Sequence, residues 1–157
     1  MTRRDSAKFA TGELQRIGWI ERIDLPEWGI TELSAKIDTG ARSSALHVDS
    51  IEEVAENRIA FDVVLDRKQP RQRVRVEADV VRRGRVRASS GQYTRRYFVR
   101  TLLRVGSTSK TIEISLVARE KMIYRMLLGR TALAGSFLVD AGRRHILTPR
   151  RRPKTDA

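Results

Sequence analysis

The stretch Ala35-Lys36-Ile37-Asp38-Thr39-Gly40-Ala41-Arg42-Ser43-Ser44-Ala45-Leu46 is the most informative segment of this 157-residue chain. A short apolar strand delivers the carboxylate of Asp38 into a tight turn, and a hydroxyl residue and a glycine follow at once. Because glycine lets backbone segments approach closely, this order of residues suits a tight turn that presents a carboxylate. Asp-Thr-Gly also occurs in ordinary turns, so the surrounding sequence decides its meaning.

Alternation of apolar and polar residues predicts several short strands on both sides of this loop, because that period is typical of half-buried strands. The turn sequence Gly-Ser-Thr-Ser at residues 106–109 and its flanking segments predict one long hairpin. The one predicted helix is short. The predicted strands cover residues 17–23, 33–38, 59–65, 74–80, 92–105 and 111–117, and the helix covers 130–134. Many short strands separated by turns predict an all-β barrel or sandwich.

The length suits one domain with a hydrophobic core. Residues 1–15 lack periodicity and predict a flexible arm, residues 16–147 the folded domain, and the arginine-rich residues 148–157 a disordered basic tail. The chain has no cysteine, which excludes disulfides, thiolate metal sites and a cysteine nucleophile. Because it lacks a secretory leader and any apolar run near the ~20 residues of a membrane helix, we expect a soluble, cytoplasmic protein without a membrane partner.

The net charge of +13 is unevenly distributed. Residues 1–66 carry 8 basic and 13 acidic groups, whereas residues 67–104 carry 13 basic and 2 acidic groups. Such a positive segment favours a polyanionic partner, for example nucleic acid, the ribosome or an acidic peptide. An arginine-rich face that only aids solubility is the alternative.

Taken together, the motifs resemble the retropepsin-like aspartic peptidases. Asp38-Thr39-Gly40-Ala41 resembles their catalytic loop, and Leu127-Leu128-Gly129-Arg130 resembles the strand-to-helix element that packs beside it. The similarity is strongest to a RimB-like bacterial branch labelled "ATP-dependent zinc protease", which is linked to RimK-type glutamate ligases and their polyglutamate products. It covers about residues 15–147 and implies a closed barrel with a flap hairpin, one short C-terminal helix and one lobe per chain.

The resemblance implies that Asp38 is the catalytic residue, that Thr39 braces it and that Gly40 leaves room for the attacking water. Aspartic peptidases need two carboxylates that share a proton. This chain has one credible Asp-Thr-Gly, since Asp140-Ala141-Gly142 lacks the hydroxyl and lies near the end. The implied enzyme is therefore a homodimeric aspartic-type endopeptidase in which one Asp38 from each chain activates water for peptide hydrolysis.

In the resemblance, residues 85–105 take the place of the flap that closes over the substrate. Arginines match carboxylates in geometry and charge, so we expect a preference for acidic or polyglutamylated peptides, with solvent-facing arginines as the alternative. The arginines of this segment are Arg85, Arg87, Arg95, Arg96, Arg100 and Arg104. The candidate substrate-binding residues are Ala41, Arg42, Ser43, Ser44, Arg87, Ser89, Gly91 and Arg96.

The sequence offers few residues that could bind the zinc or the ATP named in the branch label. His47 and Asp49 could supply two ligands from one strand face, but no third ligand is evident, and there is no glycine-rich nucleotide loop. We therefore expect no metal and no cofactor. The second functional hypothesis is a non-catalytic basic β-barrel that binds RNA or the ribosome through residues 67–104 and the tail. Its candidates for base stacking are Tyr93, Tyr97 and Phe98.

Overall fold

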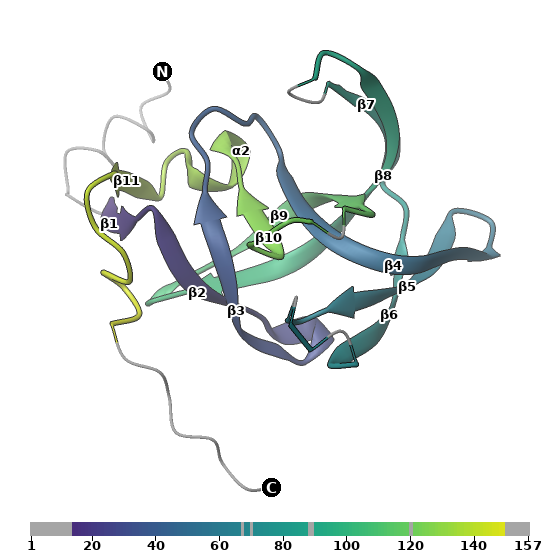
Figure 1. Ribbon diagram of the computed structural model, residues 1–157, viewed down its shortest axis with the longest axis horizontal. Helices are drawn as coiled ribbons and strands as arrows, with labels where there is room; N and C mark the ends of the chain where they lie inside the picture. Colours follow the sequence, from purple (N-terminus) through teal and green to yellow (C-terminus); the bar gives the residue numbers. More distant parts are fainter. Residues whose placement is uncertain (1–13, 67, 70, 88–89, 120, 150–157) are drawn as a thin grey trace, which may run out of the picture.

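The computed structural model describes residues 14–66, 68–69, 71–87, 90–119 and 121–149, which form an all-β barrel (Figure 1). None of its helices is long and apolar enough to cross a membrane, within the described ranges. The elements, in chain order, are β1 (Gln15–Gly18), β2 (Ile20–Leu25), the 3-10 turn η1 (Pro26–Trp28), β3 (Ile30–Ile37), β4 (Ser44–Ala55), β5 (Arg58–Val64), β6 (Arg73–Asp79), β7 (Arg82–Arg87), β8 (Tyr93–Val105), β9 (Thr108–Val117), β10 (Met126–Leu128), α2 (Arg130–Leu133) and β11 (Phe137–Asp140).

A ring of hydrogen-bonded strands closes the barrel in the order β10–β3–β2–β8–β9–β4. Closure depends on the short strand β10, which pairs in parallel with β3 on one side and antiparallel with β4 on the other. Strands β5 and β6 continue outward from β4, and β7 pairs with β8. A closed ring satisfies the backbone groups that an open sheet edge would expose. The all-β barrel and the long β8–β9 hairpin are thereby confirmed.

The core follows the alternation visible in the sequence. Ile59, Phe61 and Val63 on β5 are fully buried, while Asp62 between them is only partly buried. The Trp28 ring meets the Phe61 ring edge-on, with 5.6 Å between the two ring centres. Burial of each such side chain contributes about 1.5–3 kcal/mol. The resulting packed interior gives the loops at the barrel ends a rigid base.

The predicted strand over residues 17–23 is two strands in the structure. At Trp19 the backbone leaves the β1 direction, with its N–H donating to the Arg143 carbonyl (2.9 Å) and its carbonyl accepting from Ile37 N (2.8 Å). Strand β1 pairs in parallel with β11, whereas β2 joins the barrel. Alternation runs through the break unchanged, so periodicity alone predicts a single strand.

A buried carboxylate holds the C-terminal segment against β2. Glu21 is fully buried, and its two oxygens accept hydrogen bonds from Gly18 N (2.8 Å) and from the backbone N–H groups of Ile146, Leu147 and Thr148 (3.0, 3.2 and 3.3 Å). The Thr148 hydroxyl donates a further bond of 2.9 Å. Because a buried charge is tolerated only when it is well hydrogen-bonded, this set of donors explains the position of Glu21. The predicted arm and tail fall largely on residues 1–13 and 150–157, outside the described residues.

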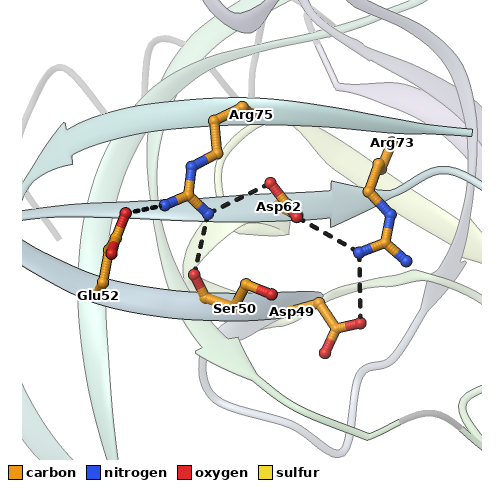
Figure 2. Close-up of polar contacts among 6 residues, drawn as sticks. All are labelled: Asp49, Ser50, Glu52, Asp62, Arg73 and Arg75. Atoms are coloured by element: carbon orange, nitrogen blue, oxygen red, sulfur yellow. Dashed lines mark hydrogen bonds and ion pairs between the residues drawn. The ribbon is translucent and has the colours of Figure 1, made fainter. Parts of the chain in front are cut away.

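Ion pairs on the outer face of β4, β5 and β6 neutralise part of the positive charge of residues 67–104 (Figure 2). Asp62 accepts from Arg73 Nη1 and Arg75 Nη1, both at 3.3 Å. Arg73 also lies 3.6 Å from Asp49, and Arg75 also contacts Glu52. Exposed pairs of this kind contribute little to stability, about 0–1 kcal/mol each. They do, however, leave these two arginines unavailable as free cations.

Candidate active site

The candidate catalytic residue Asp38 lies where β3 ends, in the loop that leads into β4. Its backbone N–H donates to the Leu128 carbonyl of β10 (2.9 Å). Because β10 lies between the strand entering the loop and the strand leaving it, both ends of the loop are held by one element (Figure 1). The position of the carboxylate is therefore set by the closure of the barrel.

Within the loop, the aspartate and the glycine form a tight turn. Gly40 N donates to Asp38 Oδ1 (2.9 Å), and Ala41 N donates to the Asp38 carbonyl (3.3 Å). A side chain at Gly40 would place its Cβ 3.2 Å from Asp38 Oδ1, so glycine keeps the space beside the carboxylate open. Asp38 is partly buried, while Thr39 and Gly40 are exposed. The carboxylate is thus anchored through its backbone and accessible from outside.

The short helix α2 holds the far side of the same loop. Arg130 N donates to the Ala41 carbonyl (2.8 Å), Thr131 N to the Arg42 carbonyl (3.0 Å) and Arg130 Nη1 to the Thr39 carbonyl (3.0 Å). Just before the helix, a Cβ on Gly129 would lie 2.5 Å from the Ser43 carbonyl oxygen, a contact that only glycine avoids. The Leu127–Leu133 element therefore packs directly against the loop.

A cleft of about 810 Å³ lies beside Asp38, between this loop and the hairpin formed by β7 and β8. Two of its lining residues are acidic, Asp38 and Glu113. Apolar contacts come from Val86, Phe98 and Leu127, among others. Six of the lining residues are arginines: Arg42, Arg82, Arg85, Arg87, Arg96 and Arg119. The cleft next to the carboxylate is therefore strongly cationic.

Most of these arginines have no acidic partner in the part of the chain that the structure describes. Arg82 is the exception, since its Nε lies 2.5 Å from Glu113 Oε1 and its guanidinium lies 3.6 Å from the centre of the Phe98 ring. Arg85 stacks 4.7 Å from the centre of the Tyr93 ring. Burial lowers the pKa of the Arg96 guanidinium, and the nearby Arg119 charge lowers it further. Concentrated, unneutralised positive charge favours an anionic ligand.

The predicted site residues separate into those that meet at the cleft and those that do not. Asp38, Gly40, Ala41, Arg42, Ser43, Arg87 and Arg96 line it together. Thr39 is exposed beside it, and Gly91 is exposed with a φ of 87°, which suits glycine. Ser44 is fully buried, and its hydroxyl accepts from Gly129 N (3.1 Å). Ser89 lies outside the described residues.

Arg85, Arg87 and Arg96 are the flap arginines that reach the cleft, whereas Arg95, Arg100 and Arg104 do not line it. Arg104 instead lines a separate hollow at the other end of β8.

Sequence reasoning missed several cleft residues that the topology brings in from a distance. Arg119 and Met122 come from the loop after β9, which reaches the site because β9 pairs in parallel with β4. Buried His47 anchors this loop, since its Nδ1 accepts from Arg119 N (3.0 Å). No local pattern in residues 118–125 signals that position. Among the described residues no group of three His, Cys, Asp or Glu side chains could hold a metal ion, so His47 and Asp49 lack a third ligand there.

Comparison with known proteins identifies the family of the chain. The model of a family described as "RimB-like: Retropepsin-like aspartic endopeptidase RimB" matches residues 16–150. The chain belongs to the RimB-like family. The resemblance based on Asp38-Thr39-Gly40-Ala41 and Leu127–Leu133 is thereby confirmed.

Relatives of this RimB-like chain include longer proteins named as probable alpha-L-glutamate ligases. The one from Parasynechococcus marenigrum is 35% identical over 144 residues, covering 90% of this chain and 31% of the relative. The one from Shewanella pealeana is 32% identical over 127 residues, covering 79% and 28%. The chain thus spans less than a third of the length of these relatives.

A solved structure is also similar: the Legionella pneumophila protein Lpg0085, of unknown function, has a TM-score of 0.69 and 28% identity. The match covers 83% of this chain and 95% of that chain.

Proposed function

We propose that the protein is an aspartic-type endopeptidase that acts as a homodimer, with Asp38 from each chain forming the catalytic pair. The observation that carries the proposal is the position of Asp38, anchored in a loop that β10 and α2 hold and open to a cleft beneath the β7–β8 hairpin. One carboxylate is insufficient for this chemistry, since the mechanism needs a base and an acid at once. A second copy of the chain supplies the other.

In the proposed reaction the two carboxylates share one proton, because like charges about 3 Å apart resist joint ionisation. The ionised carboxylate removes a proton from water as the water oxygen attacks the peptide carbonyl carbon. The protonated carboxyl donates to the carbonyl oxygen, where negative charge develops. When the tetrahedral intermediate collapses, the C–N bond breaks and a carboxyl group delivers a proton to the leaving amine.

The proposed substrate class is acidic peptide, including polyglutamate. Six arginines line the cleft against two carboxylates, so an acidic segment gains ion pairs where an apolar one would leave guanidinium groups unpaired. The names of the relatives as probable alpha-L-glutamate ligases agree with this class, since glutamate ligation creates chains rich in carboxylates. We expect the protein to cleave such chains in the cytoplasm.

The test combines analytical ultracentrifugation with hydrolysis of a peptide that carries a polyglutamate segment, on wild type and Asp38→Asn. We expect both proteins to sediment as dimers and only the wild type to cleave. Asp140→Asn is a matched control, because Asp140 Oδ1 accepts from Gly142 N (3.0 Å) in the same Asp-x-Gly turn but lies outside the cleft. Cleavage by Asp38→Asn, or an exclusively monomeric active protein, would refute the proposal.

The positive charge of the cleft is compatible with the RNA-binding alternative, but two of its three candidate residues for base stacking make other contacts in the structure. Phe98 is buried beneath Arg82, and the Tyr97 hydroxyl donates to Glu53 (3.0 Å). Of the three candidates, only Tyr93 is largely exposed. Steeply salt-dependent binding to RNA, together with no peptide hydrolysis, would favour this alternative.

A further inference from the structure

We propose that Arg96 and Arg119 form a carboxylate-binding subsite that fixes one acidic side chain of the substrate relative to Asp38. The inference deepens the proposed function and rests on it for the reaction. Binding at the subsite can nevertheless be measured without turnover.

The two arginines lie where the cleft meets a second hollow. This hollow, of about 400 Å³, is lined by apolar residues such as Ile51, Leu116 and Ala118, and also by a third arginine, Arg95. It shares Arg96, Val117 and Arg119 with the catalytic cleft. Both arginines are therefore within reach of a peptide that extends from Asp38 into the second hollow.

The arrangement of Arg96 is that of a binding group. Its Nε donates to Thr94 Oγ1 (3.2 Å) and its Nη1 to Ser115 Oγ (3.4 Å), which orient the planar guanidinium. An arginine has five N–H donors, so others remain for a ligand. In the described part of the chain neither Arg96 nor Arg119 has a carboxylate at ion-pair distance, and the nearby charge of Arg119 disfavours the charged form of Arg96. A bound carboxylate would relieve this repulsion and satisfy the donors.

Hydrogen bonds connect the subsite to the catalytic loop. Ser115, which orients Arg96, donates through its hydroxyl to the Ser44 carbonyl (3.1 Å). The Ser44 hydroxyl accepts from Gly129 N (3.1 Å), and the preceding carbonyl, that of Leu128, accepts from Asp38 N. Arg96 and Asp38 are thus held in one network across β8, β9, β4 and β10. A fixed separation between them predicts an acidic residue at one defined position from the cleaved bond.

Arg119 is positioned by a buried histidine. Its backbone N–H donates to His47 Nδ1 (3.0 Å), and His47 N donates to the Arg125 carbonyl (2.8 Å). Both ends of the segment between Arg119 and Arg125 are therefore tied to β4. This contact gives His47 a role without a metal, because it holds the backbone of the second arginine beside the first.

The test measures binding of fluorescent hexaglutamate to the Asp38→Asn protein, in which turnover is blocked. We expect Arg96→Gln and Arg119→Gln, each added to Asp38→Asn, to weaken binding about 10-fold or more, the range for a lost hydrogen bond to a charged group. Arg104→Gln is the matched control, with the same charge change on β8 outside the cleft. It should weaken binding less than about 2-fold. Hexaglutamine should bind weakly and with equal affinity to the Asp38→Asn protein and to its three double variants.

Equal losses in the Arg96, Arg119 and Arg104 variants would overturn the subsite, because they would report only the general field. So would an RNA oligomer that binds with the same Arg96 dependence while hexaglutamate does not bind. Thermal unfolding of each variant checks folding, and exposed Arg119 provides a second test if Arg96→Gln is unstable. When Arg96→Gln and Arg119→Gln are made in chains that retain Asp38, an unchanged KM for the polyglutamate peptide in both variants would reject the subsite. That result would leave the proposed peptidase function intact. Arginine-dependent binding without any hydrolysis rejects the peptidase while leaving the subsite.

Discussion

Replacement of Glu21 by glutamine should destabilise the protein far more than the loss of one surface charge. The two carboxylate oxygens accept five hydrogen bonds in a fully buried position, three of them from consecutive backbone N–H groups at residues 146–148. A glutamine has one acceptor oxygen and one NH₂ donor. Whichever way the amide turns, its NH₂ group faces at least one backbone N–H, which then has no acceptor.

The magnitude follows from these contacts. An unsatisfied buried donor costs about 1–3 kcal/mol, and the remaining bonds lose their ionic character. The lower desolvation cost of a neutral amide offsets part of this loss. We therefore expect a decrease of roughly 2–3 kcal/mol in the free energy of unfolding, which lowers Tm by about 5–10 °C for a chain of this size.

The assay is urea and thermal unfolding, combined with hydrogen exchange at residues 146–148. The matched control is Glu77→Gln, which removes the same charge from an exposed carboxylate that lies 3.5 Å from Arg58. That change should alter stability by less than about 1 kcal/mol. If Glu21→Gln unfolds like the control, or if exchange at residues 146–148 does not increase, the carboxylate does not hold the C-terminal segment.

Two further predictions concern the Asp38 loop and the outer face of β4, β5 and β6. Gly129→Ala should abolish peptide hydrolysis and reduce the free energy of unfolding by about 1–3 kcal/mol. The reason is that the added Cβ would lie 2.5 Å from the Ser43 carbonyl oxygen and displace the loop. Hydrolysis at the wild-type rate would contradict this prediction. Arg75→Gln removes the exposed contacts to Asp62 and Glu52, so we expect urea unfolding to change by less than about 1 kcal/mol, and a loss above 2 kcal/mol would show that the network in Figure 2 is structural.

The parts of the fold that the sequence predicts are those encoded by local alternation. Ile59, Phe61 and Val63 point to the core as their spacing predicts, and β8 joins β9 within the predicted turn segment 106–109, at residues 106–107. Closure of the barrel is not encoded in this way. It depends on three residues of β10 between β3 and β4, far away in sequence. A strand that short has too little periodicity to assign.

The candidate site likewise contains some residues that the sequence predicts and others that it does not. Asp38, Gly40 and Arg42 lie within five consecutive residues, so the sequence motif alone is enough to single them out. Arg119 reaches the cleft only through the parallel pairing of β9 with β4 and the contact to His47. Ser44 belongs to the motif by position, yet it faces inward to hold Gly129. Sequence adjacency thus predicts which residues share a loop but not which way each one faces.

The backbone of the Asp38 loop is held entirely by its own chain, through β10 on one side and α2 on the other. Each copy therefore carries its half of the proposed catalytic pair already shaped, and no refolding has to accompany the meeting of two copies. For the proposed homodimer we therefore expect turnover per molecule to fall upon dilution, as the copies separate, and to return at the rate of encounter when they are concentrated again.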